Sequence, residues 1–438
     1  MSPTDNPGLL KKNGVNYLVP FILITSCFAL WGVANDITNP MVKAFSKTFR
    51  MSVTDGTLVQ VAFYGGYFAM AFPAAAFIRR FSYKAGVLLG LGLYALGAFL
   101  FFPAMLSGEY YPFLAAYFIL TCGLSFLETS SNPYILAMGP ENSATRRLNL
   151  AQSFNPVGSL IGMWTAMTFI QARLNPLGSE ERADLTDSQF AAIRDADLMI
   201  LVKPYLIIGI VTLALLVLIA LCKIPVKKNT SMKIDFLRSL KRIFSIPRYR
   251  EGVIAQFFYV GVQIMCWTFI IQYGTRIFMN EGMSEIDAEI LSQKYNILAM
   301  VIFCCSRFIC TFLLRYINAG KMLATLAVGG LLLICGVIFI ESRAGLFCLV
   351  GVSACMSLMF PSIYGIALEG LGEDAKFGSA GLITAILGGS ILPPLQAAII
   401  DQGTLLGMPA VNVSFVIPMI CFAVIAIYGY RTIHRTNP

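Results

Sequence analysis

The sequence of 438 residues is strongly apolar and carries little charge. Hydrophobic residues make up 57% of it and charged residues 13%, and its mean hydropathy is +0.73. Because a soluble globular protein has about 25% charged residues, this composition excludes an ordinary soluble domain. The sequence also lacks the runs of about 10 residues of alternating polarity that a transmembrane β-barrel needs. It therefore predicts an all-α protein that crosses a membrane several times.

Apolar segments recur along the chain, each long enough to cross a hydrocarbon core of about 30 Å. Twelve spans are predicted, at 17–40, 57–78, 85–105, 112–136, 149–171, 204–222, 252–276, 293–314, 322–340, 345–368, 378–400 and 411–430. The first span follows Lys11 and Lys12 and has no small-x-small cleavage site. We interpret it as a retained helix and not as a signal peptide.

The net charge of +9 follows the connections between the spans. Even-numbered connections and both termini hold about twice as many Lys and Arg residues as odd-numbered connections, as the positive-inside rule expects. Both termini are therefore predicted to be cytoplasmic, in a multi-pass protein of the cell inner membrane. The basic excess indicates topology and no nucleic-acid partner. The longest odd connection, 172–203, is acidic and is predicted to be an extracytoplasmic cap or spacer.

Cysteine and histidine usage argues against a metal site or an enzyme. Eleven cysteines are scattered, almost all within the spans and without a metal-type C-x-x-C pair, so we expect free packing thiols. The one histidine, His434, lies near the end of the chain. No nucleophile–base pair is visible. We expect no metal, no cofactor and no enzymatic activity.

The chain divides into two similar halves. We predict an N-terminal six-helix half at 1–222, a basic cytoplasmic linker at 223–250 and a C-terminal six-helix half at 251–438. Related connections recur at 80–86, between spans 2 and 3, and at 315–320, between spans 8 and 9. Two six-helix repeats joined by such a linker are typical of the major facilitator fold, with the substrate near the midplane. Coincidence among apolar segments is the alternative.

Polar residues inside the spans point to a binding site. Glu128 lies within span 4, where an ionised carboxylate costs roughly 2.5–3.5 kcal/mol and usually faces a cavity or a pathway. Four spans carry polar residues at helical spacing, so that each group shares one face. These residues are Asn35, Asp36, Thr38 and Asn39 in span 1, Ser125, Glu128, Thr129 and Asn132 in span 4, Asn149, Gln152 and Asn155 in span 5, and Gln256, Tyr259, Gln263 and Trp267 in span 7.

These faces suit a neutral sugar. Sugar hydroxyls donate and accept hydrogen bonds, so amides and carboxylates satisfy adjacent pairs of them, while Trp267 or Tyr259 offers an aromatic face. A single amide in a membrane helix more often joins two helices, but four polar faces favour a substrate cavity. Arg307 in span 8 is a further ionisable group. Substrate contact, pairing with a carboxylate, gating and snorkelling are all open for it.

Several longer motifs resemble one branch of a known family. They lie at 30–35, 82–86, 127–133, 147–155, 255–261 and 372–378. On the basis of these motifs, the chain resembles the fucose–galactose–glucose branch of the major facilitator superfamily. The resemblance extends from about residue 17 to residue 430. The resemblance implies a major facilitator fold of 12 transmembrane helices in two pseudo-symmetric halves. It also implies import of L-fucose or a close hexose with a proton, by alternating access.

The resemblance carries over to individual residues. Glu128 matches the carboxylate that this branch uses in sugar binding and proton coupling, and Gln152 and Asn155 match amides that face the cavity. In span 1 the second acid of the branch is replaced by Asn39, while Asp36 stands where the branch has an amide. These two positions are three apart and share a helix face. Either Asp36 takes over the role of that acid, or Glu128 works alone.

We expect a sugar and a proton as partners, contact with membrane lipid, and a monomer. Two rivals stay open. One is a carrier for glucose, galactose or an amino sugar, uncoupled or coupled to Na⁺. The other is a membrane sensor that binds sugar without moving it, against which the internal repeat argues.

Overall fold

The computed structural model describes most of the chain. The described residues are 10–12, 15–38, 41–51, 58–171, 173–175, 177, 182, 184–222, 236–400, 402–405 and 407–435. They form helices and two pairs of two-residue strands. The chain separates into two compact units. Unit 1 holds Met1–Met138 and Phe154–Lys233, and unit 2 holds Gly139–Ser153 and Ile234–Pro438.

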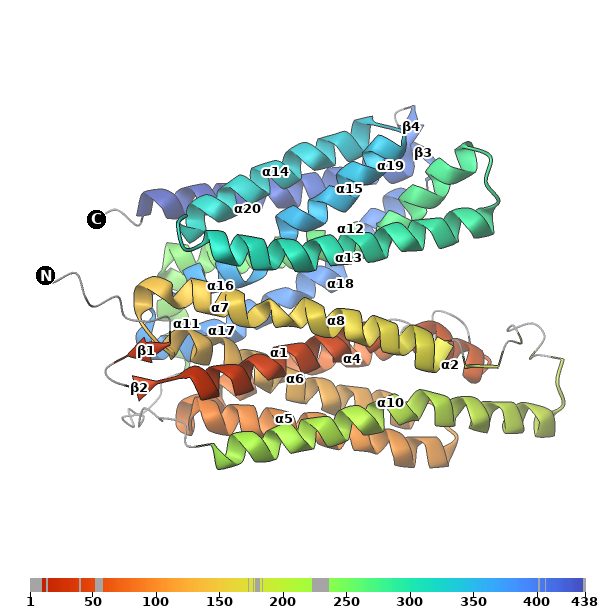
Figure 1. The fold of residues 1–438 in the computed structure, drawn as a ribbon, viewed down its shortest axis with the longest axis horizontal. Helices are drawn as coiled ribbons and strands as arrows, with labels where there is room; N and C mark the ends of the chain where they lie inside the picture. The colour runs from red at the N-terminus through yellow and green to blue at the C-terminus, as the bar shows by residue number, and fades with distance from the viewer. Residues whose placement is uncertain are drawn as a thin grey trace, which may run out of the picture. The chain divides into compact units, whose positions relative to one another are not determined.

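Unit 1 is built from helices that pack side by side. Its elements are β1 (Lys11–Lys12), β2 (Val15–Asn16), α1 (Leu18–Thr38), α2 (Met41–Thr48), α4 (Leu58–Arg80), α5 (Tyr83–Ser107), α6 (Tyr111–Ala137), α8 (Phe154–Thr165), the π-helix η2 (Ala166–Gln171) and α10 (Asp187–Leu221). Strands β1 and β2 are antiparallel. Helix α6 packs against α4 and α5, α5 also packs against α10, and α1 packs against α8 (Figure 1).

Small residues bring the backbones of α1 and α8 into contact. A β-carbon added at Gly158 would lie 1.9 Å from the carbonyl oxygen of Ala29, and one at Gly32 would lie 2.1 Å from that of Asn155. Small residues at such crossings are typical of packed membrane helices, because apolar side chains gain little from leaving lipid. The polar residues of α1 and α8 are therefore held at a fixed spacing.

Unit 2 is arranged around one long helix. Its elements are η1 (Glu141–Ser143), α7 (Ala144–Gln152), α11 (Phe236–Ser245), α12 (Pro247–Asn280), α13 (Glu285–Leu313), α14 (Ala319–Phe339), α15 (Arg343–Met356), α16 (Met359–Leu368), η3 (Gly372–Asp374), α17 (Ala375–Thr384), η4 (Ala385–Leu387), α18 (Gly388–Ile400), β3 (Thr404–Leu405), β4 (Met408–Pro409), α19 (Ala410–Ser414) and α20 (Val416–Arg435). Helix α12 packs against α13, α15, α16, α18 and α20, and α7 packs against α13 and α16.

The predicted spans correspond to helical segments, some of which are interrupted. Among the described residues, eleven helices are long and apolar enough to cross a membrane. The predicted fifth span, 149–171, is instead divided among α7, α8 and η2, with a break at Ser153. The Ser153 hydroxyl donates to the carbonyl of Asn149 at 2.8 Å, and Pro156 has no N–H group to continue the helical ladder. The segment is helical, but not as one regular helix.

The second half of the connection predicted at 172–203 is helical, so the sixth span begins earlier than the predicted 204. Helix α10 begins at Asp187, where Thr186 and Gln189 form a capping box. Its 35 residues make it about 52 Å long, which exceeds a hydrocarbon core of about 30 Å. The charged residues after position 186 therefore extend the sixth span beyond the membrane.

Two other expectations concern the linker and the cysteines. Residues 223–235 lie outside the described residues, and α11 and the start of α12 fall within the predicted linker 223–250. The boundaries of the three predicted segments stay a prediction. All eleven cysteines are free thiols, as predicted.

Candidate functional site

Glu128 lies at the centre of a buried polar group in unit 1. Its side chain belongs to α6 and is 3% exposed, and its Oε2 atom has no hydrogen-bond partner among the described residues. The amide of Asn132 donates to the backbone carbonyl of Glu128 at 3.1 Å, so the two residues share a helix face as predicted. A buried polar atom without a partner is unfavourable unless a ligand, a proton or water satisfies it. Glu128 is therefore available for binding.

Tyr67 of α4 lies near Glu128. Its hydroxyl is close enough to interact electrostatically with the Glu128 carboxyl group, and it also lies near Trp31 of α1. The Tyr67 hydroxyl is buried and likewise has no hydrogen-bond partner among the residues that the structure describes. A hydroxyl and a carboxyl oxygen, both unsatisfied and close together, suit a ligand that donates and accepts hydrogen bonds.

Asp36 is the second carboxyl group in unit 1. It is partly buried on α1, where it lies near Ser159 of α8 and near Tyr64 of α4. Asn35 precedes it and is also partly buried. Tyr64 and Tyr67 are three residues apart and share a face of α4, and Tyr64 lies near Asp36 as Tyr67 lies near Glu128.

The span-5 amides are separated by the break in the helix. Asn155 of α8 donates from Nδ2 to the carbonyl of Phe28 at 3.2 Å, which ties α8 to α1. Gln152 is the last residue of α7 and belongs to unit 2. Asn39, the alternative to Asp36, lies outside the described residues.

Helix α12 carries the predicted face of span 7. Gln256 is fully buried, and neither of its amide atoms has a hydrogen-bond partner in the described part of the chain. The Tyr259 hydroxyl donates to the carbonyl of Met356 at 3.2 Å. Gln263 and Trp267 are partly exposed, and the Trp267 indole donates to the Ser353 hydroxyl at 3.2 Å. This face therefore offers an unsatisfied amide and an accessible aromatic ring.

Arg307 of α13 is buried and binds main-chain carbonyls. Its side chain is 3% exposed. Its Nε donates to the carbonyl of Ser357, and its Nη1 donates to the carbonyl of Gln152 at 3.0 Å. The guanidinium also lies over the ring of Phe303, 4.6 Å from its centroid. No carboxylate lies in ion-pair range of it among the described residues.

Sequence reasoning missed the two α4 tyrosines. Tyrosine is counted among the hydrophobic residues, so Tyr64 and Tyr67 were taken as part of the apolar pattern of span 2. Their spacing of three within an apolar helix, around Gly65 and Gly66, was the available signal. Ser159 was missed because one serine in a membrane helix is common.

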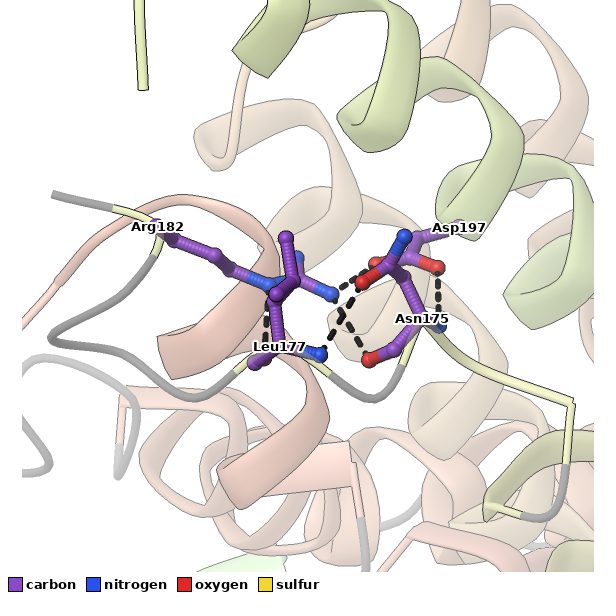
Figure 2. A network of polar contacts seen from close by, with 4 residues as sticks. All are labelled: Asn175, Leu177, Arg182 and Asp197. Carbon is purple, nitrogen blue, oxygen red and sulfur yellow. Dashed lines mark hydrogen bonds and ion pairs between the residues drawn. The ribbon is translucent and has the colours of Figure 1, made fainter. Parts of the chain in front are cut away.

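A second buried charge site in unit 1 contains only protein partners. Arg182 and Asp197 form an ion pair at 2.6 Å, with side chains 0% and 2% exposed. Arg182 also donates to the carbonyls of Leu177 and Asn175, each at 3.1 Å, and Asp197 accepts the Asn175 N–H at 3.0 Å (Figure 2). This network fastens the segment before α10 onto that helix.

The chain matches one family over most of its length. Residues 22–393 match the model of the Major Facilitator Superfamily. The L-fucose-proton symporter of Haemophilus influenzae is 52% identical over 435 residues, which cover 97% of this chain and 98% of that protein. The L-fucose-proton symporter of Escherichia coli is 34% identical over 429 residues, 96% of this chain and 95% of that protein. The glucose/galactose transporter of Brucella abortus is 30% identical over 433 residues, 98% and 97% of the two chains.

A solved structure agrees with these matches. The crystal structure of a Major Facilitator Superfamily transporter in the outward conformation superposes with a TM-score of 0.85 at 34% identity. The match covers 95% of this chain and 99% of that chain. The fold predicted from the sequence is confirmed, as is a multi-pass transporter in place of an enzyme. The chain belongs to the Major Facilitator Superfamily.

Proposed function

We propose that the protein imports L-fucose, or a close hexose or deoxyhexose, together with a proton by alternating access. The observation that carries this proposal is Glu128, a buried carboxyl group with an oxygen that has no hydrogen-bond partner among the described residues, near Tyr67, whose buried hydroxyl is also unsatisfied there. Such a pair can hold a sugar hydroxyl, and the carboxyl group can take up a proton where burial disfavours its charged form. The two L-fucose-proton symporters that match almost the whole chain support the same substrate.

The proposed roles follow from the surroundings of each residue. Glu128 and Asp36 couple the proton, and Arg307 acts in gating. The residues proposed to contact the sugar are Asn35, Asn39, Tyr67, Glu128, Asn132, Gln152, Asn155, Gln256, Tyr259, Gln263 and Trp267. Of these, Tyr67 enters from the structure and the others from the sequence. We further propose a monomer surrounded by lipid in the cell inner membrane, with both termini cytoplasmic.

Proton coupling supplies the driving force. Moving one charge inward yields roughly 2.3 kcal/mol per 100 mV of membrane potential. Since 1.4 kcal/mol is about a tenfold change in an equilibrium constant, this energy supports about a fifty-fold accumulation of sugar. A potential of ordinary size is therefore enough to concentrate a scarce sugar.

Uptake by vesicles tests the proposal. Membrane vesicles containing the protein should take up radiolabelled L-fucose and make a weakly buffered medium more alkaline as they do so. Vesicles without the protein are the control. Uptake of intact fucose with no alkalinisation would refute proton symport. Absence of uptake in the presence of sugar binding would favour a sensor.

A second candidate is a glucose or galactose carrier of the same branch. The Brucella abortus relative, named a glucose/galactose transporter, favours it. Counterflow with a panel of unlabelled sugars separates the candidates. L-Fucose should displace the label best, and stronger displacement by D-glucose or D-galactose would select this rival.

A further inference from the structure

Two backbone carbonyls in unit 2 are followed four residues later in the sequence by a proline. In an α-helix each carbonyl accepts from the N–H group four residues later. Pro156 follows Gln152 by four residues, and Pro361 follows Ser357 by four residues. Proline has no N–H group, so both carbonyls must be satisfied in another way. These positions are also the ends of α7 and α15.

Arg307 satisfies both of these carbonyls at once. Its Nε donates to Ser357 and its Nη1 to Gln152. The C-terminal end of a helix carries a partial negative charge of about half an elementary charge. The ends of α7 and α15 together therefore balance one guanidinium charge, which explains how a buried arginine is held without a carboxylate. The planar fork of arginine is needed, because it donates in two fixed directions.

Further contacts hold α7 against the same helices. The hydroxyls of Ser153 and Thr311 are 3.3 Å apart, and Asn149 Nδ2 donates to the Ser362 hydroxyl at 3.4 Å. The Ser153 and Thr311 hydroxyls each donate to a carbonyl nearby in the chain, those of Asn149 and Arg307, so they are only in contact. The Asn149–Ser362 bond is neutral and long, and such a bond breaks more easily than a charge-assisted one. Of these three contacts to α7, the one from Arg307 is the only charge-assisted hydrogen bond. The chain passes from unit 2 to unit 1 immediately after this tie, between Ser153 and Phe154.

Arg307 is also connected to the aromatic ring proposed to contact the sugar. Its guanidinium lies over Phe303, one turn earlier on α13. Phe303 in turn meets Trp267 edge to face, with ring centroids 4.9 Å apart. Trp267 is otherwise oriented by its hydrogen bond to Ser353 of α15. A movement of Arg307 therefore changes the packing of Phe303 against Trp267.

We propose that Arg307 is a positioning residue that latches the end of α7 to the junction of α15 and α16 and supports Trp267 through Phe303. Release of α7 and movement of Trp267 are then linked steps of transport. The inference rests on the proposed function for its sugar, and it adds a latch made of main-chain carbonyls. In the proposed topology α7 follows the cytoplasmic connection between spans 4 and 5, so the latch lies toward the cytoplasmic side.

A reversible cross-link tests the latch directly. The double variant Ser153→Cys/Thr311→Cys is joined by a short bis-methanethiosulfonate reagent, in a background with Cys305 and Cys310 replaced by serine. Cross-linking should abolish fucose uptake while fucose binding stays within about twofold, because the sugar face of α12 is not altered. Reduction should restore uptake. Undiminished uptake by the cross-linked protein would overturn the proposal.

A matched pair of cysteines controls for cross-linking as such. Gln396 of α18 and Ser414 of α19 form a hydrogen bond at 3.0 Å within unit 2, away from α7. The cross-linked Gln396→Cys/Ser414→Cys protein should keep its uptake. If the reduced proteins and their parent neither bind nor move fucose, the proposed sugar is wrong. The latch is then tested without fucose. The variant Asn149→Cys places a cysteine on α7, and cross-linking should slow the labelling of this cysteine by maleimide.

A charge-preserving substitution separates a latch from a structural brace. Arg307→Lys keeps the positive charge but cannot donate to both carbonyls in fixed directions. Its turnover should fall about tenfold, as expected for one lost charge-assisted bond, while the amount of folded protein is unchanged. Arg315→Lys, at an exposed position of the same region, is the control. Equal losses of folded protein, binding and turnover in Arg307→Lys would identify a brace and reject the latch.

Discussion

Two buried charge sites in unit 1 differ in how their hydrogen bonds are satisfied. Asp197 is paired with Arg182 and accepts a backbone N–H group, and Arg182 donates to two carbonyls as well. Glu128 is just as deeply buried, yet its Oε2 atom has no hydrogen-bond partner among the described residues. Burial alone therefore does not distinguish the two sites. The two sites differ in whether the carboxylate oxygens have hydrogen-bond partners.

The difference separates a charge that holds the fold from one that is free to act. A fully satisfied buried pair is fixed, and removal of one partner leaves the other charge unpaired. A carboxyl group with a free oxygen can gain a proton or a ligand without first breaking a bond. We expect substitutions at the first site to affect stability and substitutions at the second to affect transport.

The largest expected effect is at the satisfied pair. Arg182→Met should reduce the stability of the folded protein by about 3–5 kcal/mol, because Asp197 is left as an unpaired buried charge. Thermal unfolding in detergent, followed by size-exclusion chromatography, measures this loss. Uptake per folded molecule should stay normal.

The neighbouring exposed pair provides the control for that experiment. Asp195 binds Arg194 at 3.0 Å, but its side chain is 64% exposed. Asp195→Asn should change stability by less than about 1 kcal/mol. Normal stability of Arg182→Met would contradict the structural role of the buried pair.

The next largest effect is at Glu128. Glu128→Gln should lower the fucose accumulation ratio from about fifty-fold to about one, because the amide cannot carry the proton, while counterflow continues. Stability should not fall, since no partner of the free oxygen is lost. Glu109→Gln, at an exposed position after α5, is the control. Uphill accumulation by Glu128→Gln would show that the unsatisfied carboxyl group is not the coupling group.

Substitution of Asp36 tests whether the carboxyl group of Glu128 alone couples the proton. Asp36→Asn should reduce accumulation about tenfold, a change of 1.4 kcal/mol, if Asp36 shares the coupling. Adding Asn39→Asp to this variant should restore accumulation, because the two positions share a helix face. Both effects are measured in the same energised vesicles. Unchanged accumulation in Asp36→Asn would leave Glu128 as the single coupling acid.

The fold was predictable because a membrane limits the choices. Backbone groups in lipid must bond within a helix, so long apolar segments determine most of the spans. Glu128 and Asn132 were found for a related reason, since polar residues stand out in an apolar helix. The break in span 5 was harder to see, because it depends on Pro156 and Ser153 within an otherwise regular pattern.

Contacts between distant segments could not be predicted in this way. Arg182 and Asp197 are fifteen residues apart across a loop and a helix start, and their pairing depends on the path of that loop. Tyr67 comes near Glu128 only because α4 packs against α6. The start of α10 did have a local signal in the capping pair Thr186 and Gln189, which an acidic composition concealed.

The smallest expected effect extends the comparison to an exposed pair. Arg343 donates to both carboxyl oxygens of Glu281, and these hydrogen bonds hold the pKa of Glu281 below its usual value. A lowered pKa in the folded state means that the pair stabilises the fold above the unfolded pKa of about 4.3, and that this contribution is lost as the pH falls through the folded value. The thermal midpoints of the wild type and Glu281→Gln should therefore differ slightly at about pH 7 and converge at about pH 3. If the difference were as large as that for Arg182→Met, solvent exposure would not distinguish the charged pairs that stabilise this fold from those that do not.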